Sequence, residues 1–189
     1  MNLQKEYNKR KKEIKQRLKD FSAVKGEDIF YELCFCLLTP QSNAKKCDKA
    51  VGLLRKKDFL NRKINPLKYL HKNTRFHNNK SKYLLEMKKK FKDIKFKRDF
   101  LVKNVKGLGL KEASHFLRNI GYRNLAILDR HILKNLVKYR AIKEVPSTLT
   151  PKKYYEIEKK FLDFSKKVKI PMDDLDLLFW SMETGEIFK

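Results

Sequence analysis

Cysteine is scarce in this sequence, and the few residues that occur stand close together. Cys34, Cys36 and Cys47 are too few for a disulfide framework, and three thiolates cannot complete a four-thiolate metal cluster on their own. Small apolar side chains of this kind are most often buried in protein interiors. We therefore expect all three to be core residues, and we exclude an iron–sulfur cluster.

Long apolar runs are also missing. No stretch approaches the roughly 18 consecutive apolar residues that are needed to span a bilayer. The first twenty residues are heavily charged, which argues against a signal peptide and for a cytoplasmic protein. Their apolar positions recur at helical intervals and predict an amphipathic helix; these positions are Leu3, Tyr7, Ile14, Leu18 and Phe21.

Acidic residues are outnumbered by basic ones. The 189 residues include 47 Lys+Arg and only 22 Asp+Glu, for a formal net charge of +25. A surplus of this size indicates a polyanionic partner, with nucleic acid as the first candidate and an acidic protein or an anionic membrane surface as alternatives. At this length the chain is expected to form one domain or two small lobes with a substantial core.

Glycine is rare, and two of the six glycines stand within three residues of each other. Gly107 and Gly109 flank Leu108, and such a pair supplies the unusual backbone angles of a tight hairpin. From Lys111 the apolar residues recur at helical spacing as far as Gly121, a natural helix terminator. A hairpin that leads into a helix N-terminus presents unpaired N–H groups, which bind phosphate oxygens. The pattern therefore predicts a DNA-backbone contact.

Helical periodicity extends over the rest of the chain. Asp129 stands directly before another apolar run, where a helix N-cap is expected. No internal repeat or strand-like alternation appears, so we predict an all-α fold. The expected helices cover residues 28–38, 44–54, the segment after the polar loop 71–79, the run from 99 into the hairpin, the run from 130, and residues 150–168 and 172–182.

The hairpin and the residues after it resemble those of the helix-hairpin-helix DNA glycosylases, the HhH-GPD superfamily. In that family the hairpin reads roughly LPGVGxKxA, and a catalytic aspartate follows in a DxH run. Lys111 and Asp129 match the two catalytic positions and lie 18 residues apart, and His131 completes the DxH pattern. Lys106 stands where the family usually has proline, a departure outside the catalytic positions.

A second resemblance to the superfamily lies in LLTPQSN, residues 37–43, which is similar to an LLSAQxTD segment. It implies that the Gln41 side chain enters the duplex and fills the space left by an extruded base. A later segment is similar to a GLYNxKA motif that touches the DNA backbone, which implies Lys80 as a phosphate contact. Without the resemblance, Gln41 is a polar turn residue and Lys80 a solvated surface charge. The remaining implied DNA-binding residues are Gly107, Gly109 and Glu112.

The C-terminal region narrows the resemblance. Endonuclease III-like members carry four cysteines there that hold an iron–sulfur cluster, and this chain has none after Cys47. The archaeal-type (type 2) 8-oxoguanine DNA glycosylase/AP lyases resemble the chain throughout, including its short tail. This implies that Trp180 stacks on the flipped base and that Lys189 contributes its terminal carboxylate to base recognition. By position alone, Trp180 would be a core residue and Lys189 a frayed end.

The resemblance also implies a mechanism, which begins with removal of the damaged base from the stack. The Lys111 amine attacks the sugar C1′ and expels the base, leaving a Schiff base from which β-elimination nicks the strand 3′ to the lesion. An unperturbed lysine is protonated near neutral pH, so we expect the helix N-terminus and an apolar pocket to favour the neutral amine. Asp129 would stabilise positive charge that develops at the sugar.

The implied partner is double-stranded DNA that contains 8-oxoguanine. The protein is expected to act as a monomer and to have no membrane partner. No soluble cofactor is implied, although family members hold a monovalent cation at the hairpin. Here a K⁺ or Na⁺ would be bound through backbone carbonyls of residues such as Lys103, Val105 and Leu108.

We expect two helical lobes with DNA across the cleft between them. Residues 23–129 would form a central bundle that ends in the helix-hairpin-helix, and residues 1–22 with 130–189 the second lobe. Two other functions are considered. An endonuclease III-like glycosylase for oxidised pyrimidines without its cluster is disfavoured by Trp180, Lys189 and the missing cysteines. A non-catalytic DNA-binding module is disfavoured by the paired Lys111 and Asp129.

Overall fold

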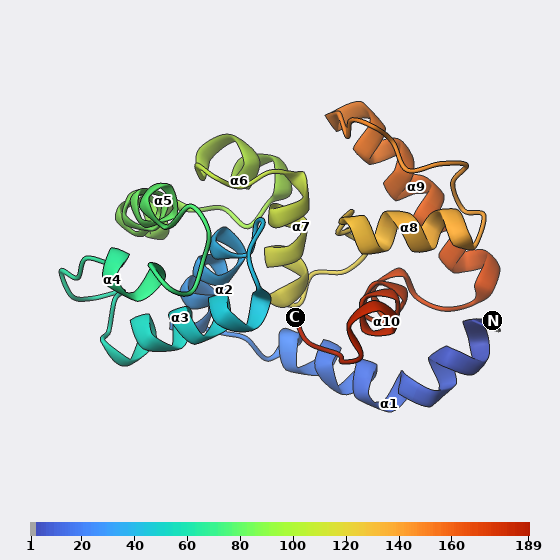
Figure 1. Cartoon of the computed structure of the whole chain (residues 1–189), viewed down its shortest axis with the longest axis horizontal. Helices are drawn as coiled ribbons and strands as arrows, with labels where there is room; N and C mark the ends of the chain where they lie inside the picture. The colour runs from blue at the N-terminus through green and yellow to red at the C-terminus, as the bar shows by residue number, and fades with distance from the viewer. Residues whose placement is uncertain (1–2) are drawn as a thin grey trace. The chain divides into compact units, whose positions relative to one another are not determined.

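The computed structural model describes residues 3–189, which fold into α-helices and one short 3₁₀ helix (Figure 1). No strand occurs within this range, so the predicted all-α fold is confirmed. None of the helices in the described part is long and apolar enough to cross a membrane. The chain forms two compact units, one of residues Val24–Phe116 and one that combines the chain up to Ala23 with Leu117–Lys189.

The unit Val24–Phe116 is built around a central apolar helix, α2. Nearly all of α2 is buried, including Phe30 and Phe35, because all but one of its residues after Asp28 are apolar. Cys34, Cys36 and Cys47 are fully buried, which confirms their expected place in the core. The elements of this unit are α2 (Glu27–Leu38), α3 (Ala44–Lys56), α4 (Leu67–Leu70), α5 (His77–Lys90), η1 (Phe91–Asp93), α6 (Arg98–Asn104) and the first part of α7 (Leu110–Asn119).

The second unit consists of α1 (Leu3–Ser22), the end of α7, α8 (Arg130–Lys138), α9 (Pro151–Val168) and α10 (Met172–Thr184). The predicted amphipathic helix at the N-terminus is confirmed, and α1 packs along α10 (Figure 1). Tyr7 Oη donates to Asp174 Oδ2 over 2.6 Å between these two helices. The Phe179 ring of α10 stacks on the ring of Tyr139, which follows α8, and on the ring of Phe161 in α9, so these helices share one core.

Residues 117–129 belong to the unit that contains α1, although the predicted central bundle extends to residue 129. Polar contacts explain the grouping. Arg118 at the end of α7 forms a buried ion pair with Asp176 of α10, with 3.3 Å between Nη1 and Oδ2. Arg123 Nη2 donates to the Leu18 carbonyl and the Ser22 hydroxyl of α1. Such long-range pairs leave no periodicity in the sequence.

Candidate active site

The glycine pair forms a tight hairpin between α6 and α7. Gly107 has φ +95°, a backbone conformation that side chains rarely adopt, and Leu108 N donates to the Val105 carbonyl over 3.1 Å. Leu108 is buried and anchors the hairpin in the core of its unit. Gly109 is exposed directly before α7, at the end of the helix where the first amides have no partner within the helix.

We predict that Gly107→Ala destabilises the protein by about 1–3 kcal/mol. A Cβ at this position would lie 2.6 Å from Tyr83 Cδ2, and the positive φ would be strained in any case. Gly52→Ala is the matched control, since Gly52 lies inside α3 with open space around a Cβ and should gain about 0.5–1 kcal/mol. Urea denaturation of both variants measures the difference, and equal stabilities would contradict a strained hairpin.

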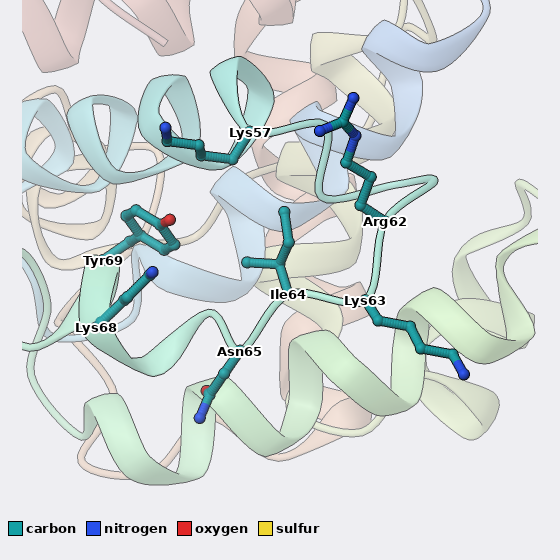
Figure 2. A pocket seen from close by; sticks show the side chains of 7 residues that line it. All are labelled: Lys57, Arg62, Lys63, Ile64, Asn65, Lys68 and Tyr69. Carbon is teal, nitrogen blue, oxygen red and sulfur yellow. The ribbon is translucent and has the colours of Figure 1, made fainter.

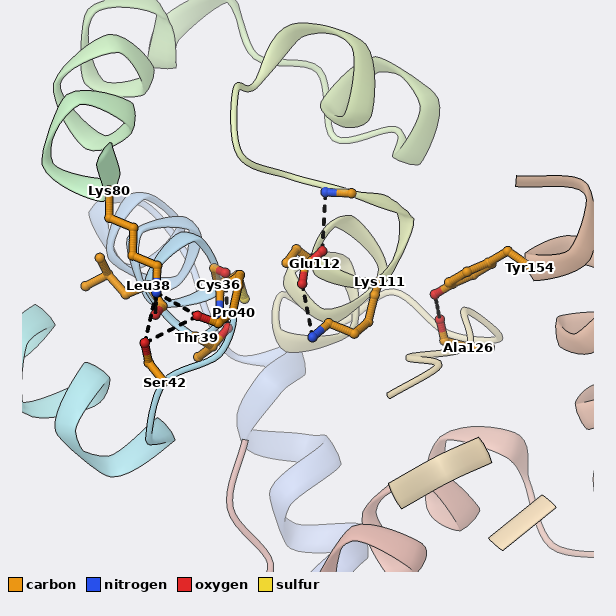
Figure 3. Close-up of polar contacts among 11 residues, drawn as sticks. Cys36, Leu38, Thr39, Pro40, Ser42, Lys80, Lys111, Glu112, Ala126 and Tyr154 are labelled. Carbon is orange, nitrogen blue, oxygen red and sulfur yellow. Dashed lines mark hydrogen bonds and ion pairs between the residues drawn. The ribbon is translucent and has the colours of Figure 1, made fainter. Parts of the chain in front are cut away.

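Lys111 stands in the first turn of α7, directly after the hairpin, with a side chain that is 33% exposed. Its Nζ forms an ion pair with Glu112 Oε1 at 3.0 Å (Figure 3). The same carboxylate accepts from Gly109 N through Oε2, which is the carboxylate half of a capping box. An apolar pocket was predicted around the Lys111 amine. In the structure the amine instead lies beside a carboxylate, and about a third of the side chain is exposed.

Asp129 is the N-cap of α8, as expected. Its Oδ1 accepts a hydrogen bond from Ile132 N over 2.8 Å. The segment that leads to it is held by α9, because Ala126 N donates to Glu158 Oε2. Tyr154 Oη also donates to the Ala126 carbonyl, as Figure 3 shows. The backbone before Asp129 is thus fixed through both the N–H and the C=O group of Ala126. Asp129 belongs to the second unit and Lys111 to the first.

A buried carboxylate, Asp176, lies in the same electrostatic environment as Asp129. Burial raises the pKa of Asp176 to about 7; the Arg118 guanidinium opposes this shift, and the charges of Asp129 and Asp173 add to it. Asp176 is not among the site residues predicted from the sequence. Its only signal is an acidic residue among apolar neighbours within a predicted helix.

We predict that Asp176→Asn changes the pH dependence of folding. The pKa of Asp176 in the folded protein lies above the unfolded value of about 3.9. The protonated side chain therefore contributes its full stability below about pH 3.9, and this contribution is lost as the pH rises through about 7. The Tm difference, variant minus wild type, should therefore rise by a few degrees between about pH 5 and about pH 8. Asp163→Asn, at an exposed position of α9, is the control for a lost charge. A difference that is constant with pH would contradict a protonated Asp176.

Gln41 and Lys80 occupy very different positions in the first unit. Gln41 is exposed and has φ +54° in the turn between α2 and α3. Lys80 is only 4% exposed, and its amine donates to backbone and hydroxyl oxygens around that turn (Figure 3). Burial lowers its pKa to about 8. The expected contact of Lys80 with a phosphate is corrected, because the amine faces protein oxygens inside the unit.

Trp180 and Lys189 lie in the C-terminal part of the second unit. Trp180 is the one partly exposed residue in the run from Met172 to Ser181 of α10, so it is not the core residue that its position alone suggests. After α10 ends at Thr184, Ile187 is buried, which holds the tail against its unit, and Lys189 is partly exposed. His131 Nδ1 lies 3.7 Å from Glu183 Oε2 of α10.

A pocket with basic walls lies elsewhere on the first unit (Figure 2). No carboxylate lines it, so it suits an anion, but none of the candidate catalytic residues takes part. The described residues contain no group of three or more His, Cys, Asp or Glu side chains placed to hold a metal ion. The lining residues of the pocket are Lys57, Arg62, Lys63, Ile64, Asn65, Lys68 and Tyr69.

The sequence is similar to those of known proteins over most of its length. A family model described as 8-oxoguanine DNA glycosylase matches residues 14–170. The 8-oxoguanine DNA glycosylase/AP lyase of Fusobacterium nucleatum is 47% identical over 99% of this chain and 96% of its own length. The protein of the same name from Methanocaldococcus jannaschii is 38% identical over 92% of this chain and 89% of its own length.

Two solved structures resemble this chain over nearly its full length. The crystal structure of the M. jannaschii 8-oxoguanine glycosylase/lyase in complex with a 15mer DNA containing 8-oxoguanine matches with a TM-score of 0.87 and 34% identity, and covers 100% of both chains. The 8-oxoguanine DNA glycosylase of Thermotoga maritima matches with a TM-score of 0.88 and 30% identity, over 99% of this chain and 96% of that chain.

Proposed function

The chain belongs to the 8-oxoguanine DNA glycosylase family, and from this premise we propose that it excises 8-oxoguanine from duplex DNA and then nicks the strand as an AP lyase. The observation that carries the proposal is the position of Lys111. It follows the glycine hairpin in the first turn of α7, 18 residues before the N-cap Asp129. We place this activity in the cytoplasm.

The lysine amine acts as the nucleophile in this proposal. Neutral Nζ attacks C1′ of the damaged nucleotide, the bond between C1′ and the base breaks, and the base leaves with the bonding electrons and a proton. The C1′–O4′ bond of the sugar then breaks, O4′ takes up a proton, and the lysine nitrogen forms a protonated Schiff base with C1′. Loss of a proton from C2′ allows the 3′ phosphate to depart with its bonding electrons. In the free protein Nζ is paired with Glu112 Oε1, so this ion pair must open before the amine can attack.

The other residues serve binding and charge stabilisation. The Asp129 carboxylate would face the positive charge that develops on the sugar while the glycosidic bond breaks. Gln41 would fill the gap in the duplex, and Trp180 and Lys189 would contact the extruded base. The net charge of +25 supports a grip on the phosphate backbone that does not depend on sequence.

The hairpin would supply the closest backbone contact. Gly107 and Gly109 are exposed at the start of α7, where helix N-terminal amides can bind phosphate oxygens; the Gly109 amide would first have to release the Glu112 carboxylate. A K⁺ or Na⁺ coordinated by carbonyls of Lys103, Val105 and Leu108 would strengthen this contact, since oxygen donors suit such ions. The Val105 carbonyl already accepts one hydrogen bond, from Leu108 N, and retains a second lone pair.

Borohydride trapping tests the proposed function. The protein is incubated with a duplex that contains one 8-oxoguanine opposite cytosine, the mixture is reduced, and covalent protein–DNA species are separated on a denaturing gel. We expect a band with this duplex and none with an undamaged one. A band only on a thymine-glycol duplex would instead indicate an endonuclease III-like enzyme. No band on either duplex, with DNA binding intact, would indicate a non-catalytic module.

A further inference from the structure

The buried amine of Lys80 is surrounded by protein oxygens. Nζ lies 2.7 Å from the carbonyl oxygens of both Leu38 and Pro40, 2.9 Å from Ser42 Oγ and 2.8 Å from Thr74 Oγ1. An ammonium group has three N–H donors, so these four oxygens use its full donor capacity. The Lys80 side chain of α5 therefore connects the end of α2, the turn after α2 and the loop before α5.

The turn that Lys80 contacts has an unusual conformation. Ser42 N donates to the Thr39 carbonyl over 3.0 Å, which defines a four-residue turn with Pro40 and Gln41 at its centre. Proline at the first central position and a positive φ at the second are typical of a type II turn. The second position favours glycine, because other residues are strained there. Here it holds Gln41, exposed and with φ +54°.

The bond to the Pro40 carbonyl is the informative one. Type I and type II turns differ mainly in the orientation of their central peptide, which rotates by about 180° between them. That peptide joins Pro40 to Gln41, and its oxygen is the one that Lys80 Nζ binds at 2.7 Å. In a type I turn the oxygen would point to the opposite side and Gln41 would relax to negative φ. The charge-assisted hydrogen bond thus opposes the relaxation of Gln41.

We propose that Lys80 is a positioning residue, which locks the Pro40–Gln41 peptide so that the Gln41 side chain is presented in one fixed direction. The inference rests on the proposed function, in which Gln41 enters the duplex. Two hydroxyls support the lock, because Ser42 Oγ and Thr74 Oγ1 lie 2.8 Å apart and Thr74 Oγ1 also donates to the Leu38 carbonyl. A preset side chain lowers the entropy that is lost when the gap in the duplex is filled.

The first test uses the protein without DNA. Gln41→Gly should relieve the strained φ and raise the Tm by roughly 1–4 °C in the wild-type background. Lys80→Met removes the amine, frees the peptide to rotate, and should abolish the gain from Gln41→Gly. Lys89→Met, at an exposed position of α5, is the control for a lost charge and should preserve the gain. An equal gain in both the wild-type and Lys80→Met backgrounds would overturn the proposal.

The second test measures single-turnover excision of 8-oxoguanine from duplex DNA. Lys80→Met should slow excision by about tenfold or more, and Gln41→Ala should do the same. In the Gln41→Ala background, Lys80→Met should have less than about a twofold effect, because the side chain it positions is absent. Full additivity, or no loss of rate in Lys80→Met, would overturn the positioning role. Ser42→Ala keeps the lysine and should give a smaller loss, which covers the case that Lys80→Met does not fold.

The two tests separate this inference from the proposed function. If wild-type protein excises no 8-oxoguanine, the proposed function fails while the stability measurements still decide whether Lys80 controls the turn. If excision is normal in the wild type and the stability gain is unaffected by Lys80→Met, the positioning role alone fails.

Discussion

Lys111→Gln is expected to abolish the borohydride-dependent cross-link and the strand nick, and to slow base excision by at least about a thousandfold, which corresponds to roughly 4 kcal/mol of transition-state stabilisation. Glutamine has a similar length but no nucleophilic amine, so the Schiff base cannot form. The helix should begin as before, because Glu112 still accepts from Gly109 N. Excision and nicking are measured under single-turnover conditions on the 8-oxoguanine duplex.

Binding separates loss of chemistry from loss of DNA contact. Removal of one cation from a chain with a net charge of +25 should weaken DNA affinity by less than about tenfold at moderate salt. Lys106→Gln is a suitable control, since Lys106 is an exposed cation of the same hairpin and has no assigned role in catalysis. It should retain the cross-link. A cross-link that persists in Lys111→Gln would assign the nucleophile to a different amine.

Local sequence signals predicted the elements of this site well. Gly107 has the positive φ that its place in a hairpin requires, and Asp129 caps α8 as a short polar side chain before an apolar run should. Both predictions depend on interactions within a few residues of the chain. The buried cysteines and the all-α fold follow in the same way, from composition and from helical periodicity.

Contacts between distant residues were not predictable from these signals. Lys80 looks like any other of the 47 basic residues until the structure shows that its amine meets Leu38 and Pro40, about forty positions earlier. Asp176 is likewise one acid among others in a helix until Arg118 and the surrounding core define its environment. Burial of a charged side chain depends on which elements pack around it, and helical periodicity does not indicate which elements these are.

Asp129→Asn is expected to lower the rate of base excision by about a hundredfold or more while the protein remains as stable as the wild type. The two functions of Asp129 depend on different properties of its side chain. As an N-cap it needs only an acceptor oxygen for Ile132 N, and asparagine is about as good an N-cap as aspartate. For the proposed stabilisation of a positively charged sugar it needs a negative charge, which asparagine lacks.

Asp129→Ala completes the comparison. It removes the acceptor as well as the charge, so it should lose the same catalytic rate and also about 1 kcal/mol of stability. Both variants are therefore measured in two ways. Thermal unfolding reports the contribution of Asp129 as an N-cap, and single-turnover excision reports the contribution of its charge to the rate. If Asp129→Asn excised 8-oxoguanine at the wild-type rate and only Asp129→Ala lost activity, the carboxylate would act purely through the start of α8. Positive charge on the sugar would then have to be stabilised by a different group, and Asp176, the carboxylate whose pKa responds to the charge of Asp129, would be the first to test.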